Sequence, residues 1–180
     1  KAAVVRALEV GGNPSSVHAA GRAARSLIEA ARAQVADLIA VKPGSITFTS
    51  GGTESNALAI ESAVAAGYDR ILLGATEHGA VSENVRATGV PVEVWPVNAD
   101  GVADLAWLSQ SLAKGGRPLV CLMLANNETG VIQPVTETAA LVREVGGWLH
   151  VDAVQAAGKI AIDFNALGAD TLALAAHKIG

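Results

Sequence analysis

The chain has few of the residues that disulfide-rich, nucleic-acid-binding or membrane-spanning proteins need. A single cysteine, Cys121, among 180 residues excludes an internal disulfide framework and suits a reducing compartment. The net charge of −4 provides no basic surface for nucleic acid. The longest apolar stretches, such as Pro118–Ala125, are too short to cross a bilayer, and the amino-terminal residues lack a signal-peptide pattern. We therefore expect a cytoplasmic protein that binds neither nucleic acid nor a membrane.

Three spacings that carry chemistry are also missing. The four histidines form no His-x-x-x-His or Glu-x-x-His pair, and Cys121 has no cysteine partner, so we expect no metal site. No Gly-x-Ser-x-Gly sequence is present, which disfavours serine-based hydrolysis. The loop 49–56 contains two glycines but lacks the lysine of a nucleoside triphosphate-binding loop.

Through nearly the whole chain, the spacing of apolar residues alternates between the period of a helix and the period of a strand. Hydrophobic residues make up 51% of it, enough to bury one sizeable core. Spacings of three and four between Val17 and Ile39 predict an amphipathic helix. Further along the chain, strands are predicted at 46–49, 70–73, 92–95, 119–124, 148–151 and 171–174, and helices at 54–66, 78–87, 104–112 and 135–145. Since strands separated by crossover helices pair in parallel, we predict an α/β fold with a mainly parallel sheet flanked by helices.

In such sheets ligands bind beyond the carboxyl ends of the strands, where loops enter helices. The loop 49–56 occupies such a position. Its glycines let the backbone approach a ligand, and the free amides of the following helix, with the hydroxyls of Thr53 and Ser55, suit a phosphate group. An ordinary helix cap explains the same residues equally well.

Three other polar motifs follow predicted strands. His78 could lie flat against an aromatic ring or shuttle a proton, or it could only bond to the backbone. The segment Asn126–Gly130 could bond to a ring substituent of a planar cofactor, although an ordinary turn has the same composition. In His150–Gln155, the heads of Asp152 and Gln155 could converge at one strand end. Asp152 could there pair with a protonated pyridine nitrogen, or it could cap the next helix.

The pair His177–Lys178 follows the last predicted strand. A lysine at the mouth of a buried parallel strand is desolvated, which favours the neutral amine that a carbonyl cofactor needs for Schiff-base attachment. Most lysines after a strand are ordinary solvated loop residues, so this interpretation depends on the upstream motifs.

Six motifs in this order resemble the cysteine desulfurases of the class V aminotransferase family, which use pyridoxal 5′-phosphate (PLP). They are Gly12–His18, Thr49–Ser55, Thr76–His78, Asn126–Gly130, His150–Gln155 and His177–Lys178. Their forms resemble the branch that serves nitrogenase and iron–sulfur cluster assembly. The resemblance implies that residues 13–180 are the PLP-binding large domain of a fold type I transferase, truncated at its C-terminus. Residues 1–12 would be a remnant of the small domain.

The resemblance also implies roles for individual residues. Lys178 would hold the cofactor aldehyde covalently and move the substrate α-proton, and His78 would stack on the ring and act in proton transfer. The other cofactor-binding residues would be Gly52, Thr53 and His177 at the phosphate, Asp152 at the ring nitrogen, and Gln155 and Asn127 at the ring hydroxyl and the substrate.

The implied reaction converts L-cysteine to L-alanine and passes the sulfur to an enzyme cysteine as a persulfide, for iron–sulfur clusters or other sulfur-containing cofactors. A homodimer and an iron–sulfur scaffold or sulfur-acceptor protein would be the partners. The alternatives are a selenocysteine lyase, another class V enzyme, or a non-catalytic scaffold with the PLP fold.

Two features depart from the family pattern. Ala175 stands where the family has a phosphate-binding Ser or Thr, and the chain stops two residues after Lys178. The family's persulfide-forming cysteine and its substrate-carboxylate arginine would therefore lie beyond this sequence. Cys121, inside an apolar run, is predicted to be a buried structural thiol, so we expect these 180 residues alone to be inactive.

Overall fold

The computed structural model describes residues 2–179 and divides into two compact units, with the division between Thr47 and Phe48. The first unit contains the helices α1 (Ala2–Glu9) and α2 (Ala19–Leu38) and the 3-10 helix η1 (Pro43–Ser45). The α2 helix confirms the helix predicted between residues 17 and 39, whereas α1 and η1 were not predicted. The domain boundary predicted after residue 12 stays a prediction.

The second unit is built on a parallel sheet of five strands. These are β1 (Arg70–Gly74), β2 (Val92–Trp95), β3 (Pro118–Met123), β4 (Trp148–Asp152) and β5 (Thr171–Ala173). They lie in the order β2-β1-β3-β4-β5, and every neighbouring pair is parallel. All residues of the central strand β3 are buried, as expected for a parallel strand covered on both faces. The predicted α/β class is thus confirmed.

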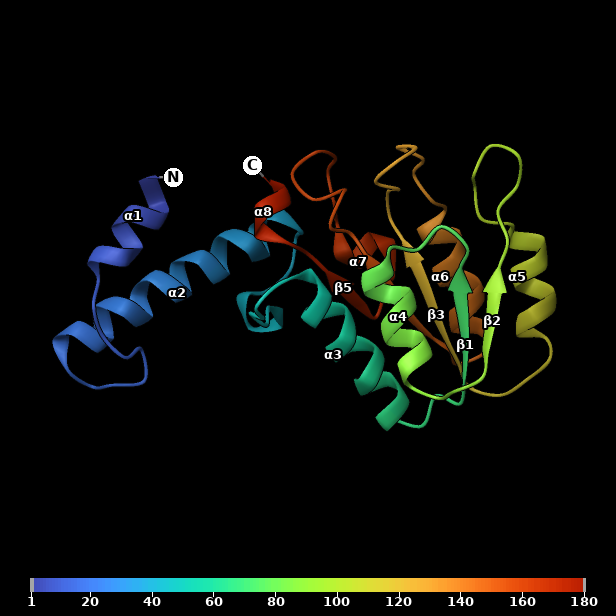
Figure 1. Ribbon diagram of the computed structural model, residues 1–180, viewed down its shortest axis with the longest axis horizontal. Coiled ribbons are helices and arrows are strands. Elements are labelled where there is room, and N and C mark those ends of the chain that lie inside the picture. The colour runs from blue at the N-terminus through green and yellow to red at the C-terminus, as the bar shows by residue number, and fades with distance from the viewer. Residues whose placement is uncertain (1, 180) are drawn as a thin grey trace. The chain divides into compact units, whose positions relative to one another are not determined.

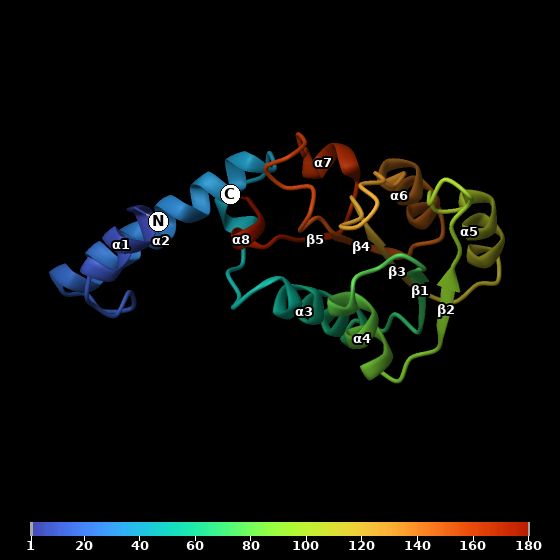
Figure 2. The same ribbon diagram turned by 45° about the horizontal axis from the view of Figure 1, so that its top comes forward.

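Helices cover both faces of this sheet (Figures 1 and 2). On one face lie α3 (Gly52–Ala65) and α4 (Gly79–Ala87), and on the other lie α5 (Leu105–Leu112), α6 (Val135–Glu144) and α7 (Phe164–Leu167). The short helix α8 (Ala176–Ile179) follows β5. The helices α3 to α6 each bury apolar residues, and burying one Leu or Ile side chain contributes roughly 1.5–3 kcal/mol.

Between the sheet and the pair α3 and α4 lies an apolar core. Its buried members come from both helices, β1 and β3: Ile60, Ala63, Tyr68, Ile71, Leu73, Val81, Val85, Leu119 and Cys121. In the register of the sheet, Cys121 pairs with His150 on β4, and His150 pairs with Thr171 on β5. Across the sheet, the buried apolar Cys121 on β3 is therefore followed by the polar residues His150 on β4 and Thr171 on β5, beneath α3.

One prediction about local structure was wrong. Residues 46–49 were predicted as a strand, but none of them pairs with a strand in the described part of the chain. An apolar run becomes a strand only where a partner supplies the ladder hydrogen bonds. The pair His177–Lys178 follows the last strand of the sheet, as predicted, and lies in the short helix α8.

The order of the strands creates a crevice between β1 and β3. From β1 the chain moves outward to β2, and it then returns to β3 on the other side of β1. The loops that leave the carboxyl ends of β1 and β3 therefore diverge, which leaves room for a ligand between them.

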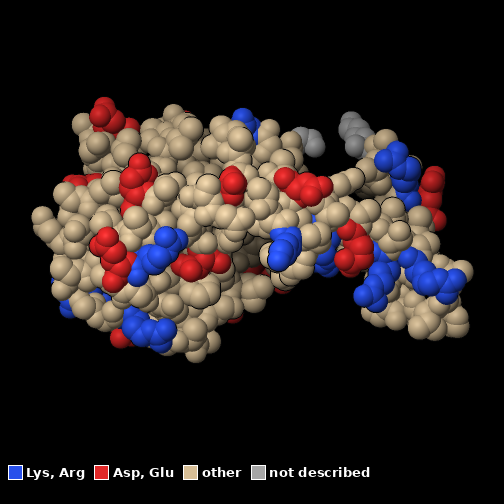
Figure 3. All heavy atoms as spheres, turned by 180° about the vertical axis from the view of Figure 1, so that it is seen from behind, with Lys and Arg blue, Asp and Glu red and all other residues tan. Residues whose placement is uncertain are grey.

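Acidic and basic side chains are interspersed on the face of the molecule that Figure 3 shows. In the described part of the chain, Arg70 and Lys114 both form ion pairs with Glu93, at 2.7 and 2.6 Å. None of the helices formed by residues 2–179 combines the length and the apolar character that crossing a membrane requires.

Candidate active site

All eight residues predicted to bind a cofactor line one cavity of about 340 Å³ in the second unit. They come from the start of α3, from the loops after β1, β3 and β4, and from α8. They are Gly52, Thr53, His78, Asn127, Asp152, Gln155, His177 and Lys178. The volume lies in the range of small-molecule sites. Parallel strands explain the convergence, because their carboxyl ends share one edge of the sheet.

The start of α3 presents its first amides without a side-chain cap. The N-cap residue is Gly51, and it has no side chain to offer them. The hydroxyl of Thr49 is occupied elsewhere, by the carbonyl of Gly51 at 3.0 Å and the hydroxyl of Ser55 at 2.9 Å. Of the two alternatives for this loop, the geometry thus favours an anion site over a simple helix cap.

A small residue at position 52 keeps this end of the cavity open. A Cβ atom on Gly52 would lie 3.1 Å from Cγ2 of Val154 and 3.5 Å from Cβ of Ala175. Ala175 is buried and lines the same cavity. The residue that departs from the family pattern therefore lies beside the α3 amino terminus.

His78 is the N-cap of α4, and its side chain has a defined orientation. Its Nδ1 atom accepts the backbone N–H of Ala80 at 3.0 Å. In the neutral ring this bond places the proton on Nε2. The backbone bond and a role in the cavity are therefore compatible, since the exposed ring also lines the cavity.

Asp152 ends β4 and is buried. Its Oδ1 accepts the backbone N–H of Val154 and its Oδ2 accepts the side-chain N–H of Asn56, both at 2.9 Å. A buried carboxylate at the cavity wall is suited to a cationic partner.

Asn56 is a site residue that the sequence analysis missed. It lies one helical turn after Gly52 and is fully buried. The separation of four residues places both on the same side of α3, and this spacing is the signal that could have identified it. Asn56 connects Asp152 to His150, whose Nε2 is 2.9 Å from Oδ1 of Asn56.

Glu77 is a second residue that was missed. Its Oε1 accepts the backbone N–H of Met123, and its Oε2 is buried without a hydrogen-bond partner in the described chain. Burial raises the pKa of this carboxyl to about 8, the nearby charge of Asp152 adds to the effect, and the Met123 bond opposes it. Met123 itself lines the cavity, so Glu77 lies directly behind the wall.

The remaining predicted residues lie on the open side of the cavity. Asn127, His177 and Lys178 are exposed. The expectation that burial desolvates Lys178 is therefore wrong for the described structure. Gln155 is half-buried, and its backbone carbonyl and Oε1 both accept from Nζ of Lys159, at 3.0 and 2.8 Å.

Cys121 lies in the middle of β3, and none of its surface is exposed. Burial raises the pKa of its thiol well above the usual value, and the adjacent Glu77 adds to this effect. The prediction of a buried structural thiol is confirmed.

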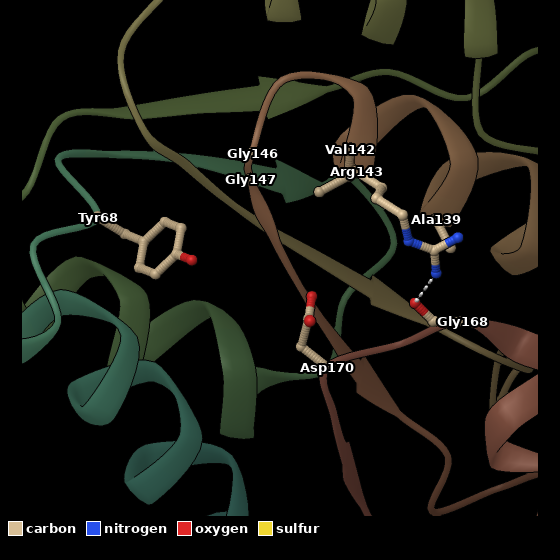
Figure 4. A pocket seen from close by; sticks show the side chains of 8 residues that line it. All are labelled: Tyr68, Ala139, Val142, Arg143, Gly146, Gly147, Gly168 and Asp170. Carbon is tan, nitrogen blue, oxygen red and sulfur yellow. Dashed lines mark hydrogen bonds between the residues drawn. The ribbon is translucent and has the colours of Figure 1, made fainter.

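A second hollow, of about 260 Å³, lies at the amino ends of β4 and β5 (Figure 4). Two of its polar side chains bond within the chain. Arg143 donates to the carbonyl of Gly168 at 3.4 Å, and Asp170 accepts the backbone N–H of Leu149 at 2.7 Å. None of the predicted site residues lines it.

The fold and the cavity agree with the comparisons to known proteins. The family model described as Aminotransferase class-V matches residues 3–180, and the chain belongs to this family. Members of the family are PLP-dependent enzymes.

Curated proteins that are similar to this chain are named as cysteine desulfurases. The chain is 39% identical over 173 residues to cysteine desulfurase IscS of Dictyoglomus turgidum, covering 93% of this chain and 44% of that protein. It is 44% identical over 178 residues to a cysteine desulfurase of Cereibacter sphaeroides, covering 93% and 45%. The chain therefore spans less than half the length of these relatives.

Solved structures show the same fold. A NifS-like protein of Rickettsia africae superposes with a TM-score of 0.89 at 36% identity, covering 98% of this chain and 50% of that one. A structure described as SspA in complex with cysteine superposes with a TM-score of 0.87 at 27% identity, covering 99% and 54%.

Proposed function

We propose that this chain is the cofactor-binding part of a PLP-dependent cysteine desulfurase. The enzyme would convert L-cysteine to L-alanine and transfer the sulfur as a persulfide. The observation that carries the proposal is the convergence of eight residues, predicted from five separate motifs, around one cavity. The relatives named as cysteine desulfurases and the neighbour described in complex with cysteine support the choice of substrate.

The cavity suits PLP in three respects. The uncapped amino terminus of α3, opened by Gly52, fits a phosphate group. The Asp152 carboxylate fits a protonated ring nitrogen, and the amine of Lys178 is available for covalent attachment. When bound, PLP supplies an electron sink for the substrate α-carbon.

The protein's own groups would divide the remaining tasks. Asp152 would hold the ring-nitrogen proton, and Lys178 would carry the α-proton between positions on the substrate. His78 would cover the ring face, with its Nε2–H directed away from the Ala80 amide that holds Nδ1. Thr53 and His177 would bind phosphate with Gly52, and Gln155 and Asn127 would contact the ring hydroxyl and the substrate.

We also propose that the protein is a cytoplasmic homodimer that passes sulfur to an iron–sulfur scaffold or another sulfur-acceptor protein. The support is the resemblance to the family, together with the sparse cysteine usage that suits a reducing compartment. Sedimentation of the protein at its natural length would test the dimer.

The test of the function is the Lys178→Ala substitution in the protein at its natural length. The unsubstituted protein should bind PLP, yield a borohydride-trapped adduct at Lys178, and release alanine from cysteine. Lys178→Ala should lose the adduct and the activity, whereas Lys42→Ala, an exposed lysine of the other unit, should keep both. A trapped adduct in Lys178→Ala, or selenocysteine as the only substrate, would contradict the proposal.

A further inference from the structure

Behind the cavity, five polar side chains form a continuous hydrogen-bonded chain. It runs from Trp148 through Thr171, His150 and Asn56 to Asp152. We propose that Asn56 and His150 are positioning residues, which orient the Asp152 carboxylate toward the cavity. This inference rests on the proposed function, because the oriented carboxylate matters only if a cationic ring nitrogen is its partner.

The fold explains why these groups meet. His150 and Asp152 are two residues apart on β4, so both side chains point to the same face of the sheet. On that face α3 packs against β3, β4 and β5, and Asn56 is one of its buried residues. Thr171 is the register partner of His150 on the neighbouring strand β5.

The two ends of the chain determine its direction. The indole of Trp148 can only donate, and the carboxylate of Asp152 can only accept. Trp148 Nε1 donates to Thr171 Oγ1 at 3.3 Å, and Thr171 Oγ1 is 2.9 Å from His150 Nδ1. At the other end, Asn56 Nδ2 donates to Asp152 Oδ2 at 2.9 Å. These two ends leave both bonds of His150 to be assigned, and the bond to Thr171 follows from the bond to Asn56.

That bond follows from the amide of Asn56. Because its NH₂ group faces Asp152, its oxygen faces His150 Nε2, at 2.9 Å. An amide oxygen only accepts, so Nε2 carries the proton. In the neutral ring Nδ1 is then an acceptor, and the hydroxyl of Thr171 donates to it. Every donor in the chain thus has one acceptor.

Burial keeps this pattern in place at neutral pH. His150 is 1% exposed, and burial lowers the pKa of its imidazole to about 4. A neutral His150 cannot place a second positive charge near Asp152, so the ring nitrogen of a cofactor would be the cationic partner of that carboxylate. The other carboxyl nearby, Glu77, has a pKa raised to about 8 by burial, which favours its neutral form at neutral pH.

The first test needs no cofactor. In the 15N-labelled protein at neutral pH, NMR should show His150 as the neutral tautomer with the proton on Nε2. A proton on Nδ1, or an imidazolium ring, would overturn the inference. This measurement stands even if substituted proteins fail to fold.

The second test uses Asn56→Leu, which is close in size but removes the donor to Asp152. With 15N-labelled PLP bound, the ring nitrogen should lose protonation, and PLP should bind about 10-fold to 100-fold more weakly. Thr171→Val should shift the His150 resonances and weaken binding by less. Thr138→Val serves as the control, because Thr138 is also buried and its hydroxyl donates to the backbone carbonyl of Pro134, the N-cap residue of α6, at 2.8 Å.

The outcomes separate this inference from the proposed function. If the unsubstituted protein binds PLP at Lys178 but Asn56→Leu leaves the ring-nitrogen signal and the affinity unchanged, the positioning role is wrong and the proposed function stands. If the unsubstituted protein binds no PLP, the proposed function fails, and the tautomer of His150 still shows whether the hydrogen-bonded chain exists.

Discussion

The carboxyl group of Glu77 accepts the backbone N–H of Met123 and thereby ties the loop after β1 to the end of β3. These two strands flank the point where the chain changes direction across the sheet. The second oxygen of Glu77 is buried without a partner among the described residues. The carboxyl is therefore best accommodated in its neutral form, which is consistent with its pKa of about 8.

Glu77 should make the stability of the protein fall as the pH rises. Below its ordinary pKa of 4.5, the group is protonated in both the folded and the unfolded states. Between pH 4.5 and about 8, only the unfolded state releases the proton. The free energy of unfolding should then decline by up to about 1.4 kcal/mol per pH unit. Glu77→Gln should remove this part of the decline in urea unfolding followed across that range.

The matched control is Glu83→Gln, because Glu83 is exposed on α4. It should keep the slope of the unsubstituted protein. Equal slopes for Glu77→Gln and the unsubstituted protein would show that Glu77 ionises normally.

Cys121 should not react with a thiol reagent while the protein is folded. The side chain has no exposed surface and its thiol pKa is raised, so both access and the reactive thiolate are lacking. Ser109→Cys, which adds an exposed thiol on α5, should react on the order of 100-fold faster or more. Native Cys121 reacting as fast as the added thiol would contradict the assignment, and in urea both should react alike.

Ala175→Ser should tighten PLP binding about 5-fold to 10-fold, as one added hydrogen bond would. The side chain lies beside the amino terminus of α3, where Gly52 opens the cavity, and a hydroxyl there could donate to a phosphate. Ala125→Ser, at another part of the same cavity wall, is the control and should change little. Titration of the apo protein with PLP, followed by absorbance, measures both. Equal gains from both variants would show that Ala175 is not at the phosphate.

The 180 residues alone should release no alanine from cysteine. A cofactor site cannot replace a missing nucleophile, and the single cysteine is buried in the core. The protein at its natural length, assayed beside it, is the positive control. Alanine formation by the 180-residue chain at a comparable rate would show that the sulfur acceptor does not have to be a cysteine of the protein itself.

Much of the fold was predictable because the signals that form its helices and strands lie in neighbouring residues. The five strands of the sheet and the helices α2 to α6 were predicted within a few residues of their observed bounds, since apolar periodicity and Gly or Pro punctuation act over short distances. The strand predicted at 46–49 failed for the opposite reason, because a strand depends on a distant partner. The short helices α7 and α8 contain only four residues each, too few for a periodic signal.

By itself, the sequence determined which residues end the strands, and hence that Asp152, His78 and Asn127 would lie near one edge of a parallel sheet. Only the tertiary structure decided that Asn56 meets Asp152 and His150, from which it is separated by 96 and 94 positions. Helix and strand periods are properties of neighbouring residues, whereas these contacts depend on how α3 packs across β4. That packing is set by the burial of the whole apolar face of α3 against the sheet. No single sequence motif describes such a face.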